Sequence, residues 1–117
     1  MSVPSAGDII SFKPELDAKG HEQQGARPWL VVSVKAYNEA SKLVMVCPIT
    51  THQGRAEQAN PAEVLLPPNC GASGVVLTFQ LQTIDWVARK AKPLGAVPNA
   101  TLKAVLNRPG FCGGSLI

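Results

Sequence analysis

Residues 20–34 read GHEQQGARPWLVVSV and join a dense polar segment to an apolar run. The polar part holds an imidazole, a carboxylate, two amides and a guanidinium, with glycines at positions 20 and 25. The apolar part, residues 28–34, is typical of a buried strand, and Pro28 marks the point where loop becomes sheet. Chemically active side chains on a loop braced by a rigid strand are typical of a functional site.

Short strands separated by turn residues are predicted on both sides of this segment. We expect them at residues 7–12, 28–34, 42–50, 62–66 and 74–78, with a continuation at 83–88 and a bridging stretch at 91–97. Asn38 is expected to form a turn or a cap, and residues 67–71 form another turn. Residues 13–26 are longer than most connections in compact domains, which favours a functional loop.

The last regular element is a predicted helix. Leu102, Val105 and Leu106 follow helical spacing, and Asn99 is the expected N-cap. Many short strands followed by one helix predict a mainly β fold, either a small bent barrel or a two-sheet sandwich.

Length and composition limit the number of domains and the kinds of partner that we expect. The 117 residues predict one domain over 1–117, with a core at about 7–107 and a tail at 108–117. No apolar run approaches the roughly 18 residues that span a bilayer, and the N-terminus lacks a secretory pattern, so we expect a cytoplasmic protein without membrane contact. The formal charge of +3 permits a polyanionic partner without identifying one.

The cysteines do not indicate a disulfide framework or a zinc site. There are three of them, an odd number, and no two are spaced as CxxC. Cys47 lies within the apolar stretch VMVC, so we expect a packed core thiol. We predict neither a metal ion nor a cofactor. The phosphate-binding GxxxxGK loop, HExxH, GxSxG and the dinucleotide fingerprint are also absent from the sequence.

The polar loop offers the groups for acid–base chemistry. His21 and Glu22 can move a proton, and Arg27 can stabilise a developing phosphate or oxyanion charge. Because Arg27 precedes Pro28, its backbone is pushed towards an extended conformation. Its rigid fork of donors suits a phosphate better than a lysine does. The alternative is a solvated loop with a surface ion pair.

Other candidates carry two interpretations each. The hydroxyls and imidazole of Thr50, Thr51 and His52 are suited to bind a phosphate or position a nucleophile, or these residues simply end a strand. Trp86 beside Asp85 stacks on a base or, as we favour, packs in the core. The basic run at residues 89–92 follows a nucleic-acid backbone or solvates an edge strand.

Four ordered blocks of the sequence resemble the MazF/PemK (Kid) family of toxin endoribonucleases. They are GDII at 7–10, GHEQQGARP at 20–28, VCPITT at 46–51, and GVV at 74–76 followed by Gln80 and TIDW at 83–86. The second block is the most specific, and it is especially similar to the PemK branch. The resemblance covers roughly residues 7–107.

The resemblance implies an SH3-like small barrel of two bent antiparallel sheets with a C-terminal α-helix, assembled as a homodimer. It implies the toxin of a toxin–antitoxin pair, which cleaves single-stranded RNA at short sequence motifs without a metal ion. The ribose 2′-OH attacks the adjacent phosphorus and leaves 2′,3′-cyclic phosphate and 5′-OH ends. A cognate acidic antitoxin is the implied protein partner.

Residue roles follow from the same blocks. Arg27 is implied to stabilise phosphate charge and to protonate the leaving oxygen, Glu22 and His21 are base or proton-shuttle candidates, and Thr50 is a phosphate-contacting hydroxyl. The expected substrate-binding residues are Gln23, Gln24, Thr51, His52, Arg55 and Gln80. The loop from residue 51 to 60 is expected to encode base recognition.

The sequence departs from the PemK branch at the predicted fifth strand. That branch has a catalytic arginine and aspartate where this chain has Leu77 and Phe79, neither of which moves a proton or holds a phosphate. Glu22 and Arg27 must therefore carry more of the catalysis. Phe79 stacks on a base or fills a dimer interface. A catalytically weakened module that binds nucleic acid or a peptide is the main alternative, and a relative of the gyrase-poisoning toxins with this barrel is a third.

Overall fold

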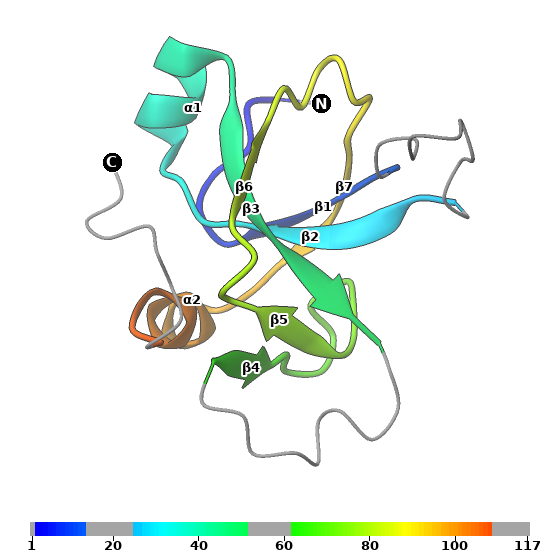
Figure 1. Cartoon of the computed structure of the whole chain (residues 1–117), viewed down its shortest axis with the longest axis vertical. Helices are drawn as coiled ribbons and strands as arrows, with labels where there is room; N and C mark the ends of the chain where they lie inside the picture. Colours follow the sequence, from blue (N-terminus) through cyan, green and yellow to red (C-terminus); the bar gives the residue numbers. More distant parts are fainter. Residues whose placement is uncertain (1, 14–24, 52–61, 109–117) are drawn as a thin grey trace.

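The computed structural model describes residues 2–13, 25–51 and 62–108. In chain order the elements are β1 (Asp8–Phe12), β2 (Arg27–Val31), α1 (Lys35–Ser41), β3 (Val44–Thr50), β4 (Glu63–Leu65), β5 (Val75–Leu77), β6 (Gln82–Ile84), β7 (Lys92–Ala96) and α2 (Asn99–Leu106). The predicted mainly β fold with a C-terminal helix is confirmed (Figure 1).

The long strand β3 organises the antiparallel sheet. β2 pairs with one side of β3, through Trp29 opposite Pro48 and Val31 opposite Val46. β6 pairs with residues 44–46 of β3, and β5 with its last two residues. The hydrogen-bonded path runs β4–β5–β3–β2–β1–β7, with β6 as a branch on β3. Over the three described segments the sheet is therefore open, with β4 and β7 as its two ends.

The turn after β4 and the strand β7 are in close backbone contact. A Cβ atom built on Gly95 of β7 would lie 2.1 Å from the carbonyl oxygen of Cys70, and one built on Gly71 would lie 2.4 Å from that of Leu94. Only glycine lets the two backbones approach this closely. The turn after β4 thus packs directly on β7, and the sheet curls towards a barrel that the hydrogen bonds of the described residues do not close.

Both faces of the central strands are buried. Neighbouring residues on a strand point to opposite faces, so Ile9 belongs to one core cluster and Ile10 to the other, both with no exposed surface. This explains why β2 reads as a continuous apolar run instead of an alternating one.

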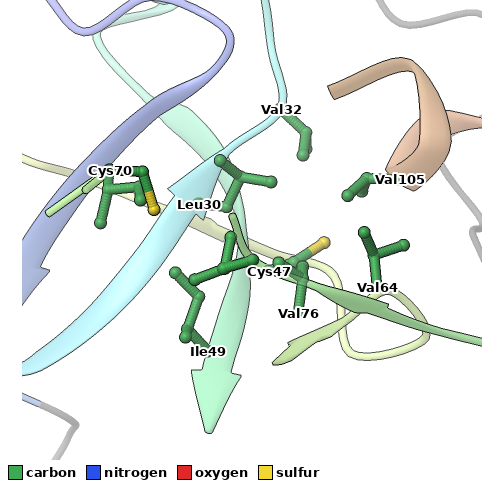
Figure 2. Packing of buried hydrophobic residues seen from close by; sticks show 10 residues of the cluster. Leu30, Val32, Cys47, Ile49, Val64, Cys70, Val76 and Val105 are labelled. Carbon is green, nitrogen blue, oxygen red and sulfur yellow. The ribbon is translucent and has the colours of Figure 1, made fainter. Parts of the chain in front are cut away.

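The first cluster lies between the sheet and α2. Its members in Figure 2 include Leu30 of β2, Cys47 of β3, Val76 of β5 and Val105 of α2, whose side chains converge on one space. Val105 is fully buried, which confirms the predicted apolar face of the helix. The expected core positions of Cys47 and Trp29 are likewise confirmed, with 0% and 7% exposure.

Three local expectations were wrong. Residues 38–41 form most of α1 instead of a turn, and Asn38 is buried inside it. Its side-chain amide donates to the carbonyl oxygens of Pro4 and Ser33, and its Oδ1 accepts from the Ser33 hydroxyl. The bridging stretch contains a full strand, β7, because it pairs with β1. Residues 86–88 lie in a turn instead of extending β6.

Two further observations concern the ends of the fold. Pro98, not Asn99, is the N-cap of α2, and no side chain caps this end. Residues 109–117 of the expected tail lie outside the described residues, so the predicted domain and tail boundaries stay predictions. No helix in the described segments is long and apolar enough to cross a membrane.

Candidate active site

The start of β2 and the end of β3 lie at the same end of the sheet. They do so because β2 and β3 are antiparallel neighbours. The polar segment before β2 and the segment after β3 therefore join the described fold at one place. Their candidate residues His21, Glu22, Gln23, Gln24, His52 and Arg55 all lie outside the described residues.

Arg27 is exposed at the first position of β2. It pairs with Phe12 of β1, two positions from the pairing of Ile10 with Trp29. Residues directly opposite in an antiparallel pair share a face of the sheet, so Arg27 lies on the face that holds Phe12 and Trp29. The rings of Phe12 and Trp29 stack with centroids 4.6 Å apart. The strand register thus places the exposed Arg27 on the same face as a stacked aromatic pair.

Thr50 is half-buried at the last position of β3. Alternation along β3 places it on the same face as Pro48, which pairs with Trp29. Arg27 and Thr50 are therefore brought to one face at one end of the sheet, and their joint catalytic role stays a prediction. Thr51 follows directly and is exposed.

The two strands take different neighbours at this end. Beyond the Trp29–Pro48 pair, Thr50 pairs with Val75 of β5, while Arg27 pairs with Phe12. Gly74, just before β5, allows the backbones of β5 and β3 to approach each other here, because a Cβ atom at position 74 would lie 1.9 Å from the Thr50 carbonyl oxygen. The glycine that precedes β5 thereby fixes the backbone of a candidate catalytic residue.

Gln80 occupies a different place. It is exposed in the turn between β5 and β6, which lies beside the middle of β3 because β5 pairs with Ile49 and β6 with Val46. Its backbone N–H donates to the carbonyl oxygen of Leu77 at 3.2 Å. The described contacts do not join Gln80 to Arg27, and its role in base recognition stays a prediction.

The positions that depart from the PemK branch differ from each other. Leu77 is buried, with 9% exposure, and belongs to the interior of the sheet. Phe79 is 41% exposed. Leucine at position 77 thus contributes packing, whereas Phe79 presents an aromatic surface to solvent.

A cationic contact beside Arg27 could not be read from the sequence. The guanidinium carbon of Arg89 lies 5.1 Å from the centroid of the Phe12 ring, and its Nη2 donates to the Lys13 carbonyl oxygen at 3.0 Å. The sequence presents Arg89 only as part of a basic run. Its partners are more than seventy residues away in the chain, and no local pattern indicates such a pairing.

The two described cysteines, Cys47 and Cys70, are both buried. Burial raises the pKa of the Cys47 thiol to about 12, so it is protonated at neutral pH. Cys70 is buried, and its thiol lies 3.3 Å from the carbonyl oxygens of Pro67 and Ala72. Among the described residues no three His, Cys, Asp or Glu side chains gather as metal ligands. Independence from metal stays a prediction.

Comparison with known proteins identifies the family. Residues 5–108 match the PemK-like, MazF-like toxins of type II toxin–antitoxin systems. The chain belongs to this family. Endoribonuclease PemK of Escherichia coli is 40% identical over 100 residues, which cover 86% of this chain and 73% of that protein. Endoribonuclease toxin MazF of Escherichia coli K12 is 35% identical over 105 residues, 88% and 87% of the two chains.

Solved structures of the PemK/MazF family share the fold. The crystal structure of MazE–MazF from Deinococcus radiodurans superposes with a TM-score of 0.77 at 39% identity, over 91% of each chain. An endoribonuclease in complex with its cognate antitoxin from a mycobacterial species superposes with a TM-score of 0.65 at 25% identity, over 87% of this chain and 86% of that one. The expected family and its fold are confirmed.

Proposed function

We propose that this PemK/MazF-family chain is a toxin endoribonuclease that cleaves single-stranded RNA in the cytoplasm without a metal ion. The observation that carries the proposal is the placement of Arg27. It is exposed at the start of β2, on the face that holds the Phe12–Trp29 stack and Thr50. The relatives named endoribonuclease PemK and MazF support RNA as the substrate.

The reaction needs a base, an acid and a stabilising cation. A base takes the proton of the ribose 2′-OH, whose oxygen attacks the adjacent phosphorus as the bond to the 5′-oxygen breaks. The 5′-oxygen takes up a proton, leaving a 2′,3′-cyclic phosphate and a 5′-OH. The Arg27 fork stabilises the charge on the phosphorane, and the Thr50 hydroxyl contacts a phosphate oxygen. Glu22 and His21 are the proposed proton carriers.

Substitution of Arg27 tests the proposal. Purified chain is incubated with a long RNA in EDTA, and the cut sites and end groups are mapped. We expect cleavage with 5′-OH ends, and Arg27→Ala should lower its rate at least about 100-fold through loss of charge stabilisation. Because Arg27 is exposed, the variant should fold normally. Lys103→Ala removes an exposed cation on α2 and should cleave like wild type. Undiminished cleavage by Arg27→Ala would contradict the role.

The alternative is a binding module without activity, which the loss of an arginine and an aspartate at Leu77 and Phe79 favours. Expression in a bacterial host separates the two functions. Growth arrest by wild type but not by Arg27→Ala supports the enzyme. Equal growth with both, together with RNA binding by the purified chain, supports the module.

We also propose that the chain forms a homodimer and that an acidic antitoxin covers Arg27. The structural relatives solved as complexes with an antitoxin support such a partner. An extended acidic segment suits an exposed arginine. Sedimentation should give about twice the 12.3 kDa chain mass. Added antitoxin should abolish cleavage, and undiminished cleavage with bound antitoxin would argue against coverage of Arg27.

A further inference from the structure

A cationic pocket lies at the end of β1, next to the candidate active site. It has a volume of about 400 Å³, within the usual size range of small-ligand sites. Its described lining includes Phe12 and four cations, Lys13, Arg89, Lys90 and Lys92, and no acidic side chain. Ala26, which also lines it, directly precedes Arg27. The pocket thus adjoins the start of β2.

The turn between β6 and β7 (Figure 1) carries Arg89 and Lys90, and Lys92 follows as the first residue of β7. Asp85 Oδ1 accepts from the backbone N–H groups of Val87 at 3.1 Å and Ala88 at 3.0 Å. The N–H of Arg89 donates to the Asp85 carbonyl oxygen at 3.0 Å. The side chain of Asp85 therefore builds the turn, which fixes where the basic residues leave the backbone.

Lys90 occupies a backbone conformation that favours glycine. Its φ is 55°, in the left-handed region, where a side chain costs about 1 kcal/mol. Glycine would relieve this strain and supply no charge. Residues with a strained backbone cluster at functional sites. A lysine in this conformation therefore favours a binding role for its ammonium group.

Arg89 is oriented before any ligand arrives. Its guanidinium lies over the Phe12 ring, which stacks on the buried Trp29, and one of its amino groups donates to the Lys13 carbonyl oxygen. These contacts fix the plane of the fork, so less side-chain freedom is lost on binding. Arg27 is the strand partner of the same Phe12, so the backbone positions of Arg27 and the guanidinium of Arg89 both lie next to this residue.

We propose that this pocket binds a backbone phosphate of the RNA substrate, on a nucleotide next to the one cleaved at Arg27. Lys90 and Lys92 supply the charge, and Arg89 supplies oriented donors. This inference rests on the proposed endoribonuclease function. RNA is favoured over an acidic peptide because the pocket adjoins Arg27, whose proposed ligand is also a phosphate, and because a flexible single strand can place successive phosphates on both cationic sites.

A double variant removes the charge without adding strain. Lys90→Gly suits the left-handed backbone, and Lys92→Ala shortens an exposed side chain. The matched control is Lys35→Ala with Lys103→Ala, which removes two exposed lysines from the helices. Circular dichroism checks that both variants fold. Binding is measured with fully 2′-O-methylated RNA, which lacks the attacking hydroxyl, and cleavage is measured with ordinary RNA.

We expect the double variant to raise Kd and KM about 10-fold with kcat nearly unchanged. The slope of log Kd against log salt should fall by about 0.7 for each RNA phosphate that the variant no longer neutralises. Wild-type affinity and slope in the double variant would overturn the proposal, and so would an equally large rise of Kd in the control. Weaker binding of polyglutamate with unchanged RNA binding would overturn it in favour of an acidic protein partner.

The two proposals fail in distinguishable ways. If wild type does not cleave RNA, the endoribonuclease function fails, and the binding arm still tests the pocket. If wild type cleaves but the double variant binds and cleaves normally, only the pocket assignment fails.

Discussion

Burial sets the protonation of Cys47. Its side chain is fully enclosed, and this raises its pKa from 9.0 to about 12. An unfolded chain loses this proton near its ordinary pKa, so above about pH 9 the unfolded state binds fewer protons than the folded one. We expect the free energy of unfolding to fall as pH rises from about 9 to 12, by up to about 1.4 kcal/mol per pH unit.

Urea unfolding between pH 8 and 10.5 measures this effect. Cys47→Ala lacks the thiol, so its stability should start lower, because of the cavity, but decline less steeply with pH. The difference between the two curves isolates the contribution of Cys47, because all other side chains are the same in both proteins. Parallel curves would contradict the assignment.

Phe79 presents an aromatic side chain to solvent. It is 41% exposed, beside the exposed Gln80. Stacking on a base is worth about 1–3 kcal/mol. We therefore expect Phe79→Ala to weaken RNA binding about 5- to 150-fold. Leu65→Ala, at a position 63% exposed, should have no effect. Unchanged RNA affinity with a weaker dimer in sedimentation would place Phe79 in the dimer interface instead.

At the scale of elements, the sequence patterns correctly predicted the strands and the helix that bury an apolar face. The strands at β1, β2, β3, β4 and β5 and the helix α2 all lie within their predicted ranges, apart from single-residue offsets. α1 was missed because Asn38, a common turn residue, is held inside the helix by Pro4 and Ser33. β7 was missed because all its residues are exposed and its stability comes from pairing with β1.

The packing of β7 depends on Gly95. A Cβ atom there would lie 2.1 Å from the Cys70 carbonyl oxygen, so Gly95→Ala must push β7 away from the turn after β4. We expect a loss of at least about 2 kcal/mol in the free energy of unfolding, measured in urea. The control is Gly25→Ala, where no atom of residues 2–13, 25–51 or 62–108 lies within 4 Å of the added Cβ and the positive φ of 58° opposes a side chain. It should cost about 1 kcal/mol. Equal costs would show that the contact does not constrain β7.

For the candidate site, the candidate residues could be identified from the sequence, but their proximity follows only from the register of the sheet. Arg27 and Thr50 come from separate motifs, and the pairing of β2 with β3 places both on one face. Arg89 illustrates what sequence could not supply, because its contact with Phe12 depends on the turn that Asp85 builds. Long-range contacts of this kind follow from topology and not from local spacing.

At the scale of the molecule, five positively charged side chains lie in one region of the fold, although the formal charge of the chain is only +3. Arg27 and the four pocket cations lie around the end of β1. If each neutralises one phosphate of a single strand, the slope of log Kd against log salt is about 3.5. We therefore expect RNA affinity to fall about 100-fold between roughly 50 and 200 mM salt.

Filter binding of 2′-O-methylated RNA at several salt concentrations measures this slope. The Lys35→Ala/Lys103→Ala control should keep the slope of the wild type, since its lysines lie on the two helices, away from the pocket. Arg27→Ala should lower it by about 0.7. A fall in affinity of less than about 3-fold over this range corresponds to at most one neutralised phosphate. Such a result would mean that the clustered charge does not bind the RNA backbone and that apolar contacts carry the affinity.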